Sequence, residues 1–546
     1  MPHSTSMPAT GLQAVILCGP GSSFPTFTSN PDEHPKALLP IANRPMVWYP
    51  IDFCLRMGMT SITLICPPSA SQALTTAFNT NPFLTGLPLP RPDILAPAGL
   101  DQNTGTADIL RLSEVRELIK TDFIVLPCDL VCELAGEKLL QAWMVKSASL
   151  ADLLGTNRFS SACQSRHSGA LGVWYNTKAA SLTAVKGEET DFIATAPLPP
   201  SAGPPPKGSV FPNLSKLVYS MPTDSLNDVI EEKKVLPVRN GLLRSHPRVC
   251  MYASHRDAHV YIFPHWILDF IKSNERMESI GEDVVGWLAK AGWQKGLAEK
   301  LHLNSLFRGK PGDGTDDSTS ESLASPRGAS PTQCVGSNSA ELSELKVPPV
   351  LAYVHASRDE QPLPLIRRVD TAQLLLATSL QLAKLPSVEE AGAESASPFA
   401  HARKVAYPEG VKARTTITKQ DSLLAENVTV EEKTSIKETV VGANCQIKEG
   451  AKLSQCLLME GVVVGKGCKL SKCILGKRCV IGDGSVLTDC EVQENLLVEP
   501  RTEDKDNKLM SSEGLEATEA EMEEVLQEAD ADVAVAMDEA ASASGY

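Results

Sequence analysis

The first part of the chain alternates short apolar runs with amphipathic stretches. The apolar runs are short enough for buried strands, and they cover Ala14–Cys18, Ser61–Cys66, Asp93–Leu95 and Asp122–Pro127. The stretches between them carry apolar residues at helical spacing, and they cover Met46–Met57, Ser69–Phe78 and Thr106–Lys120. Strands that alternate with helices predict an α/β fold with a mainly parallel sheet, whose ligands bind beyond the carboxyl ends of the strands.

Further along, the pattern is less regular. It predicts antiparallel edge strands at Leu217–Ser220 and Leu236–Pro237, and a strand at His259–Phe263 that runs into a helix at Trp266–Ile271. A helix at Gly281–Ala289, a strand at Val350–His355 and a helix at Ala372–Leu385 complete this part.

A repeat governs the chain beyond Val405. Aliphatic residues recur there at intervals of 6, 6 and 5, without a polar exception, at Leu424, Val430, Ile436, Val441, Ile447, Leu453, Leu458, Val464, Leu470, Leu475, Ile481, Leu487, Val492 and Val498. A period of 17 residues with three inward positions predicts triangular coils that stack as a solenoid. Gly442, Gly465, Gly476 and Gly482 each follow one of these aliphatics, where we expect turns with positive φ. Ordinary antiparallel strands, the alternative, would alternate with period two.

Composition divides the chain further. We expect a first domain at 11–385, with a Pro-rich insertion at 195–209 and a disordered insertion at 309–341, then a linker at 386–403 and the repeat domain at 404–500. The formal net charge is −15, and residues 501–546 hold fourteen Asp/Glu against three Lys/Arg. This tail therefore accounts for most of the charge and is expected to be disordered, with docking onto a basic partner as the functional alternative.

The cysteines do not indicate disulfides. The chain has fourteen, without a CxxC pair or a secretory leader before Gly11, so reduced thiols in the cytosol are the simpler interpretation. Six of them lie from Cys445 to Cys490, where we expect them to pack as small apolar residues. Cys128 and Cys132 lack a histidine cluster, so no zinc site is predicted, and no apolar run is long enough for a transmembrane helix.

The chemistry-bearing residues begin at the end of the first strand. Gly19-Pro20-Gly21 allows close approach of the backbone to a ligand, and Lys36 places a positive charge nearby, as a phosphate site requires. Pro20 removes one backbone donor from this loop. A tight turn with no ligand is the competing interpretation.

Two more candidates follow other strand ends. Gly105 and Thr106 open a predicted helix, where the threonine could hydrogen-bond a base or cap the helix. Asp129 is placed to hold Mg²⁺ against phosphates, although a cap or turn role is equally compatible with it. For a second metal-binding carboxylate, Asp257 is only a weak candidate, so no metal site is predicted.

These positions resemble the opening of the sugar-nucleotide pyrophosphorylases, which have a glycine-rich loop ending in an arginine and then PKPLLP-like residues. Here the second half is intact as Pro35-Lys36-Ala37-Leu38-Leu39-Pro40, but Ser23 stands where the family has its phosphate-contacting arginine. The repeat domain looks like the left-handed parallel β-helix of hexapeptide-type repeats. No histidine occurs from Lys404 onward, which disfavours the acyl transfer seen in some β-helix enzymes and favours an assembly surface.

Other segments resemble the gamma-subunit family of eukaryotic translation initiation factor 2B, which joins a nucleotidyltransferase-like domain to a left-handed β-helix. The segments are Trp48-Tyr49-Pro50, Arg56-Met57-Gly58-Met59, Gly105-Thr106-Ala107-Asp108, Leu126-Pro127-Cys128-Asp129-Leu130, Asp257-Ala258-His259, Thr434-Ser435-Ile436-Lys437 and Cys456-Leu457-Leu458-Met459. The epsilon subunit has a similar layout but ends in a helical-repeat domain, which the segment from Arg501 is too short to build.

The resemblance implies a non-catalytic, regulatory and structural subunit of the cytosolic complex that exchanges GDP for GTP on initiation factor 2 and is inhibited by its phosphorylated form. The implied partners are an epsilon-type catalytic subunit, the alpha, beta and delta subunits and initiation factor 2, without membrane or direct nucleic-acid contact. No cofactor is implied beyond weak binding of a guanine nucleotide at a degenerate site of Gly19, Gly21, Lys36, Gly105, Thr106 and Asp129. The alternative is a working mannose-1-phosphate guanylyltransferase, which Ser23 disfavours because the triphosphate loses an electrostatic clamp.

Overall fold

The computed structural model describes residues 10–101, 103–147, 168–178, 185, 187–199, 208–308, 347–355, 364–392 and 395–511. The chain forms two compact units. The N-terminal unit takes in Met1–Pro20 and Met46–Val369, and the C-terminal unit takes in Gly21–Pro45 and Asp370–Tyr546. The predicted domain boundaries stay a prediction, and the predicted disordered insertion at 309–341 lies outside the described residues.

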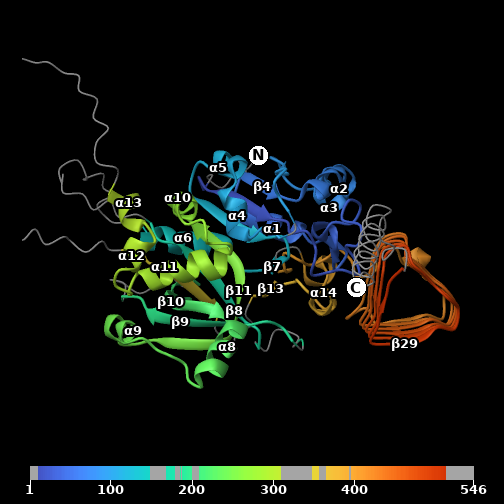
Figure 1. Cartoon of the computed structure of the whole chain (residues 1–546). Helices are drawn as coiled ribbons and strands as arrows, with labels where there is room; N and C mark the ends of the chain where they lie inside the picture. Colours follow the sequence, from blue (N-terminus) through green and yellow to red (C-terminus); the bar gives the residue numbers. More distant parts are fainter. Residues whose placement is uncertain are drawn as a thin grey trace, which may run out of the picture. The chain divides into compact units, whose positions relative to one another are not determined.

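The N-terminal unit is built on a nine-stranded mixed sheet in the order β5-β4-β1-β6-β11-β8-β12-β10-β9 (Figure 1). In this order the strands are β5 (Asp93–Leu95), β4 (Ser61–Ile65), β1 (Gln13–Leu17), β6 (Phe123–Pro127), β11 (Cys250–Phe263), β8 (Leu171–Asn176), β12 (Leu351–His355), β10 (Leu214–Pro222) and β9 (Asp191–Pro197). The first four are parallel, as the alternating pattern predicted. From β11 onward most pairings are antiparallel, so the sheet is mixed.

Helices flank this sheet, and their apolar faces supply much of the core, because the amphipathic stretches were long enough to bury one side. They are α1 (Trp48–Arg56), α2 (Pro68–Thr80), α3 (Pro82–Thr85), α4 (Thr106–Arg111), α5 (Ser113–Leu118), α6 (Gly136–Ser147), α8 (Thr223–Lys233), α9 (Asn240–Ser245), α10 (Trp266–Ser273), the π-helical η3 (Ile280–Val285), α11 (Gly286–Ala291), α12 (Leu297–Lys300) and α13 (Leu303–Arg308). A small sheet pairs β7 (Leu130–Cys132) with β13 (Ile366–Arg368).

Two expectations for this unit need correction. The predicted edge strand at Leu236–Pro237 is wrong, because these residues lie in an exposed connection between α8 and α9, where no strand among the described residues supplies hydrogen-bond partners. The Pro-rich insertion begins later than predicted, since β9 continues through Pro197, and residues 200–207 lie outside the described part.

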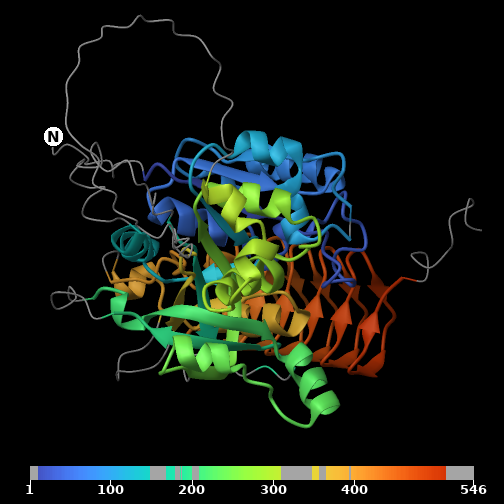
Figure 2. The same ribbon diagram turned by 60° about the vertical axis from the view of Figure 1, so that its left-hand side comes forward.

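The repeat forms three parallel sheets whose strands are two or three residues long, with one strand on each side of a triangular coil (Figure 1). Figure 2 shows the strands stacked as successive rungs. Sheet D contains β15 (Leu423–Leu424), β18 (Val440–Val441), β21 (Leu457–Leu458), β24 (Ile474–Leu475), β27 (Glu491–Val492) and β30 (Lys508–Leu509). Sheet E contains β16 (Thr429–Val430), β19 (Gln446–Ile447), β22 (Val463–Val464), β25 (Val480–Ile481) and β28 (Leu497–Val498). Sheet F contains β14 (Thr416–Ile417), β17 (Ser435–Lys437), β20 (Lys452–Ser454), β23 (Lys469–Ser471), β26 (Val486–Thr488) and β29 (Glu503–Lys505).

The predicted register is confirmed, because all fourteen aliphatics of the repeat are buried, the most exposed being Val498 at 5%. Successive strands pair in register at a step of 17 residues, as in Ile447, Val464 and Ile481. The predicted left-handed β-helix therefore describes this unit. Its coils extend beyond residue 500, since β29 and β30 add to the last rungs.

The reason given for four glycines of the repeat was wrong. Gly442, Gly465, Gly476 and Gly482 do not have positive φ, a conformation found instead at other corner residues such as Gly450 and Gly467. A Cβ at Gly482 would lie 2.4 Å from the nitrogen of Pro500 in the next coil, so close approach of successive coils requires glycine there.

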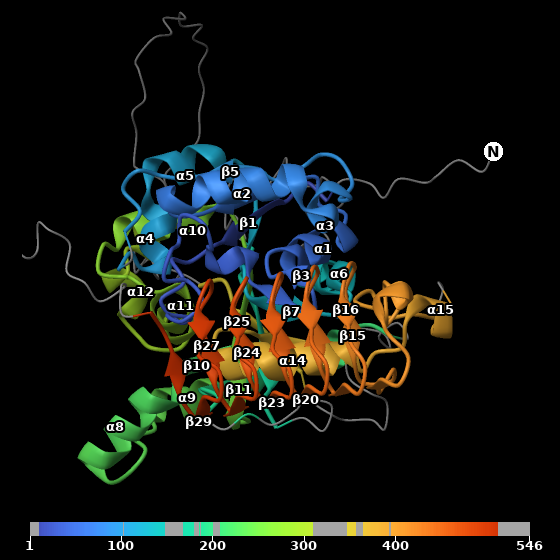
Figure 3. The same ribbon diagram turned by 90° about the vertical axis from the view of Figure 1, so that its right-hand side faces the viewer.

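The rest of the C-terminal unit is short. It contains the two-stranded sheet of β2 (Pro40–Ile41) and β3 (Arg44–Pro45), α14 (Ala372–Ala383) and α15 (Val388–Ala391). Figure 3 shows α14 running beside the rungs, and α14 contacts β18 and β21 of sheet D. α15 lies within the predicted linker, and a capping box between Ser387 and Glu390 caps its N-terminus.

Candidate functional site

The loop after β1 is a compact turn. Gly21 has φ +94°, and the amide of Phe24 donates to its carbonyl oxygen at 2.8 Å. The hydroxyl of Thr28 lies 2.8 Å from the carbonyl oxygens of both Gly21 and Phe24. The ammonium of Lys36, in the 3-10 helix Lys36–Leu38, lies 5.7 Å from the centre of the Phe24 ring and is mostly buried. These groups stabilise the turn itself.

The segment Gly21–Pro45 is fastened to the β-helix of its own unit. The Thr26 hydroxyl donates to Glu491 at 2.9 Å, and the Ser29 hydroxyl donates to Glu494 at 2.6 Å. Near the other end of the segment, the Arg44 guanidinium donates to two backbone carbonyls, those of Phe399 and Ala400. The polar groups near the would-be phosphate loop are therefore engaged by this chain.

Gly105 and Thr106 start α4, as predicted, but a neighbouring segment occupies their polar groups. The Thr106 hydroxyl accepts a hydrogen bond from the amide of Ile280 at 2.9 Å, and the Ala107 amide donates to the Glu278 carbonyl at 2.8 Å. A Cβ at Gly105 would lie 2.3 Å from the Glu278 carbonyl oxygen. Glycine is needed here for this close approach between two parts of the unit.

Asp129 follows β6 and is paired with an arginine. Its side chain is 2% exposed, and its Oδ1 lies 3.4 Å from the Nε of Arg368. The Val369 amide donates to the Asp129 carbonyl at 2.8 Å, next to the pairing of β7 with β13. The strand β13 thus brings a fixed positive charge to the carboxylate that was weighed as a possible Mg²⁺ ligand.

Asp257 lies on β11, next to a second carboxylate. Its amide donates to Asp191 at 2.6 Å, and its own carboxylate accepts from the His259 amide at 2.8 Å and from the Tyr261 hydroxyl. Burial, and after it the charge of Asp191, raise the pKa of Asp257 to about 7. Burial also raises the pKa of Asp191. The strand is irregular between Asp257 and Tyr261, and His259 has φ +51°.

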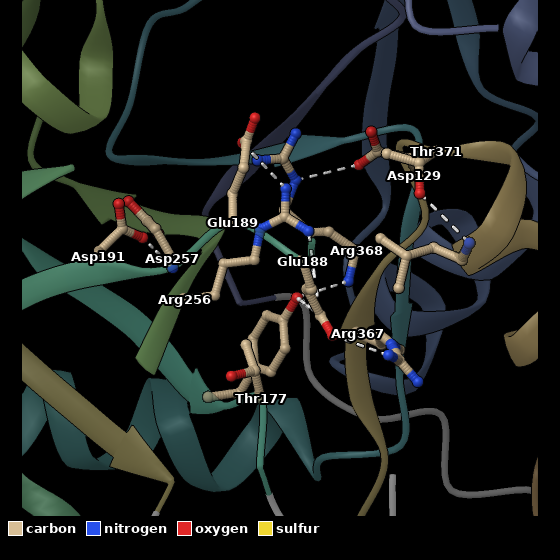
Figure 4. Close-up of polar contacts among 12 residues, drawn as sticks. Asp129, Thr177, Glu188, Glu189, Asp191, Arg256, Asp257, Arg367, Arg368 and Thr371 are labelled. Carbon is tan, nitrogen blue, oxygen red and sulfur yellow. Dashed lines mark hydrogen bonds and ion pairs between the residues drawn. The ribbon is translucent and has the colours of Figure 1, made fainter. Parts of the chain in front are cut away.

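A row of alternating charges accompanies these carboxylates (Figure 4). Glu188 lies 2.8 Å from Arg367 and 4.0 Å from Arg256, and Arg256 lies 3.5 Å from Glu189. The side chains of Glu188, Arg256 and Arg367 are each at most 4% exposed. Buried charges require such partners, because an unpaired ion in a protein interior is costly.

This arrangement suits an internal ion-pair network better than divalent-metal chemistry. Arg368 supplies the positive charge that a cation would otherwise place against Asp129, and Asp257 is partly protonated near neutral pH. In the described part of the chain, no three His, Cys, Asp or Glu side chains are grouped to hold a metal ion.

Of the six predicted site residues, Gly19, Gly105, Thr106 and Asp129 belong to the N-terminal unit, and Gly21 and Lys36 belong to the C-terminal unit. The charged residues that surround Asp129 and Asp257 were not predicted from the sequence; they are Arg256, Arg367, Arg368, Glu188 and Asp191. The adjacent pair Arg367-Arg368 was the available signal, since two arginines beside an apolar segment seldom occur without carboxylate partners.

The thiols match the expectation that the cysteines of the repeat pack as small residues. The six cysteines from Cys445 to Cys490 are buried and free. Burial raises the pKa of Cys445 to about 12. The thiol sulfurs of Cys456 and Cys473 each lie 3.2 Å from the carbonyl oxygen two residues earlier in the chain. The hydroxyl of Thr439 makes the equivalent contact at 2.7 Å. Thiol and hydroxyl therefore fill equivalent corners of successive coils.

Comparison with known proteins gives matches to both parts of the chain. Residues 405–503 match the family model described as the EIF2B subunit epsilon LbH domain. The translation initiation factor eIF2B subunit gamma of Schizosaccharomyces pombe is 28% identical over 295 residues, which are 54% of this chain and 55% of that protein. The gamma subunit of Caenorhabditis elegans is 20% identical over 279 residues, which are 50% of this chain and 57% of that protein.

A third relative is the eIF2B subunit epsilon of Dictyostelium discoideum, 31% identical over 131 residues, which are 24% of this chain and 17% of that protein. The aligned regions thus span a little over half the length of the gamma relatives. No helix in the described residues is long and apolar enough to cross a membrane.

Proposed function

We propose that this chain, a relative of the gamma subunits of translation initiation factor eIF2B, is a regulatory and structural subunit of an eIF2B-type guanine-nucleotide exchange complex in the cytosol. The observation that carries the proposal is the combination of a gamma-type match over half of the chain with an eIF2B-type β-helix at residues 405–503. Its expected partners are an epsilon-type catalytic subunit, the alpha, beta and delta subunits, and initiation factor 2.

The geometry supports a non-catalytic role. Nucleotidyl transfer requires positive charge and backbone donors on the phosphates and carboxylates on Mg²⁺. Here Asp129 is paired with Arg368, the groups of Gly105 and Thr106 face Glu278 and Ile280, and Ser23 stands in the loop in place of arginine. We therefore propose that the nucleotide site of Gly19, Gly21, Lys36, Gly105, Thr106 and Asp129 is degenerate, with no requirement for a cofactor.

Affinity purification of the full chain, tagged and expressed in its own cytosol, tests the assembly. We expect eIF2B subunits, an epsilon-type chain among them, to co-purify in fixed ratio, and the isolated chain to exchange no nucleotide on initiation factor 2. Recovery of the chain alone as a homo-oligomer would contradict the proposal.

A second measurement tests the alternative enzyme. The purified chain is incubated with Mg²⁺, a nucleoside triphosphate and a sugar 1-phosphate, and pyrophosphate release is followed. We expect none above the background without enzyme. Release that disappears in Asp129→Ala would establish a working pyrophosphorylase and refute the degenerate site.

A further inference from the structure

The segment Ile230–Met251, here named the basic arm, contains the end of α8, the connection to α9, α9 itself and the start of β11. α8 and α9 follow β10 along the chain (Figures 1 and 3). The arm is almost wholly exposed, yet it is rich in aliphatic residues. The exposed apolar side chains of the arm are Ile230, Val235, Leu236, Val238, Leu243 and Met251. Val235 is 62% exposed and Leu243 is 51% exposed. So many exposed apolar side chains within one short segment indicate an interaction surface.

The arm is anchored to the body of the N-terminal unit. Leu242 is buried in a small cluster with Trp293, whose indole N–H donates to the Val218 carbonyl at 2.8 Å. Gly241 also lies against the Trp293 ring. At the other end of the arm, α8 buries Leu226. The exposed aliphatics are therefore carried by a packed element.

Charge sets the arm apart from the rest of this acidic chain. It carries Lys233, Lys234, Arg239, Arg244 and Arg248 against only Glu231 and Glu232. None of these five cations forms an ion pair with a carboxylate in the described residues, whereas lysines of the β-helix do, as in Lys433 with Glu449 at 2.7 Å. The positive charge of the arm is thus left for a partner.

The basic surface continues onto α11. The Lys290 ammonium lies 4.8 Å from the ring centre of the partly exposed Trp287 and 4.7 Å from that of Tyr219. Burial lowers the pKa of Lys290, and the nearby charge of Arg239 lowers it further. The arm and α11 therefore share one patch in which cations surround apolar side chains.

We propose that the basic arm is a docking surface for an acidic amphipathic helix of a partner protein. The apolar stripe of such a helix would cover the aliphatics around Val238 and Leu243, and its carboxylates would pair with Arg239 and Arg244. A second copy of this chain would bring a surface of the same charge and be repelled. RNA fits less well, because its bases are recognised by stacking on aromatic side chains, whereas the arm offers aliphatic ones and the Trp287 and Tyr219 rings beside it already contact the Lys290 ammonium. This inference does not depend on the proposed function.

The test measures binding of a fluorescein-labelled 18-residue helical peptide to the full chain by fluorescence anisotropy. The peptide carries Leu at positions 4, 8, 11 and 15 and Glu at its remaining exposed positions, and a control peptide has the same composition with scrambled order. We expect saturable binding of the first peptide alone, weakened about tenfold or more by the double variant Val238→Asp/Leu243→Asp and by Arg239→Glu/Arg244→Glu.

The matched control is Lys452→Glu/Lys469→Glu, which makes the same charge change at exposed positions of sheet F and should leave the affinity unchanged. Unchanged thermal midpoints show that the arm variants fold. Equal binding of both peptides, or insensitivity to both arm variants, overturns the proposal. Tighter binding of a 12-nucleotide RNA that is lost in the arm variants assigns the surface to nucleic acid instead, and self-association that is lost in them assigns it to a second copy.

Discussion

Val464→Asp tests the register of the β-helix at a position that the predicted register places in the interior of the coil. Val464 is fully buried between Ile447 and Ile481 of the neighbouring coils. Its neighbour Val463 points outward from the same strand and is partly exposed. Val463→Asp therefore makes the same chemical change one residue away, and only the register distinguishes the two variants.

The expected cost follows from burial. Loss of a buried valine side chain removes about 1.5–3 kcal/mol of apolar transfer free energy. Placing a carboxyl group without a hydrogen-bond partner in that position adds roughly 2–7 kcal/mol, which brings the total to several kcal/mol. Val463→Asp should lie within about 1 kcal/mol of the wild type, since its carboxylate stays hydrated. Val464→Thr keeps the shape and buries only a hydroxyl, so it should cost about 1–3 kcal/mol.

The assay is urea unfolding of the full chain, with hydrogen exchange of peptides from 440–490 to localise the change. We expect Val464→Asp to open these coils and to lose recovery with the proposed epsilon-type partner when the two are co-expressed, whereas Val463→Asp keeps its exchange protection. The buried carboxyl has a raised folded pKa, so the penalty should grow as the pH rises above about 4, the unfolded value. If the two aspartate variants lose equal stability, or if Val464→Asp folds and pairs normally, the register is wrong.

The remaining predictions concern the N-terminal unit and the tail. Arg368→Ala leaves the buried Asp129 carboxylate without the guanidinium that pairs with it, so the free energy of unfolding should fall by about 3–5 kcal/mol in thermal or urea unfolding. Full stability of the variant would show that this ion pair is unimportant for stability. Asp257→Asn should flatten the pH dependence of stability between about pH 4 and 7. The raised pKa of Asp257 in the folded state makes the wild type gain stability as the pH falls through 7 towards the pKa of the unfolded chain. Parallel pH profiles of variant and wild type would contradict a raised pKa for Asp257. Deletion of residues 512–546 should leave the thermal midpoint unchanged. Deletion from Thr502 onward also removes β29 and β30, so it should lower the midpoint. Equal midpoints of the two deletion variants would show that the last coil adds no stability.

The β-helix was predictable almost residue by residue because its rule is local. Each inward position recurs after a fixed number of residues, so the pattern of aliphatics specifies the coil, the strand and the buried face together. The role of its glycines was not predictable in this way. Whether Gly482 needs positive φ or merely a missing Cβ depends on how closely Pro500 of the next coil approaches.

The parallel half of the large sheet was predictable for a similar reason, since apolar runs and amphipathic helices alternate along it. The antiparallel half was not, because β8, β11 and β12 pair across long sequence separations that no local pattern encodes. A strand was predicted at Leu236–Pro237, but no strand among the described residues lies beside this segment to pair with it.

By itself the sequence determined where apolar side chains recur and which strand ends carry Gly105 and Asp129. Tertiary structure alone decided what those strand ends face. Arg368 reaches Asp129 through β13, more than two hundred residues along the chain, and the amide of Ile280 reaches the Thr106 hydroxyl from the segment after α10. The physical reason is that a buried polar group is defined by the partner that satisfies it, and that partner comes from whichever distant segment the packing of the core places beside it.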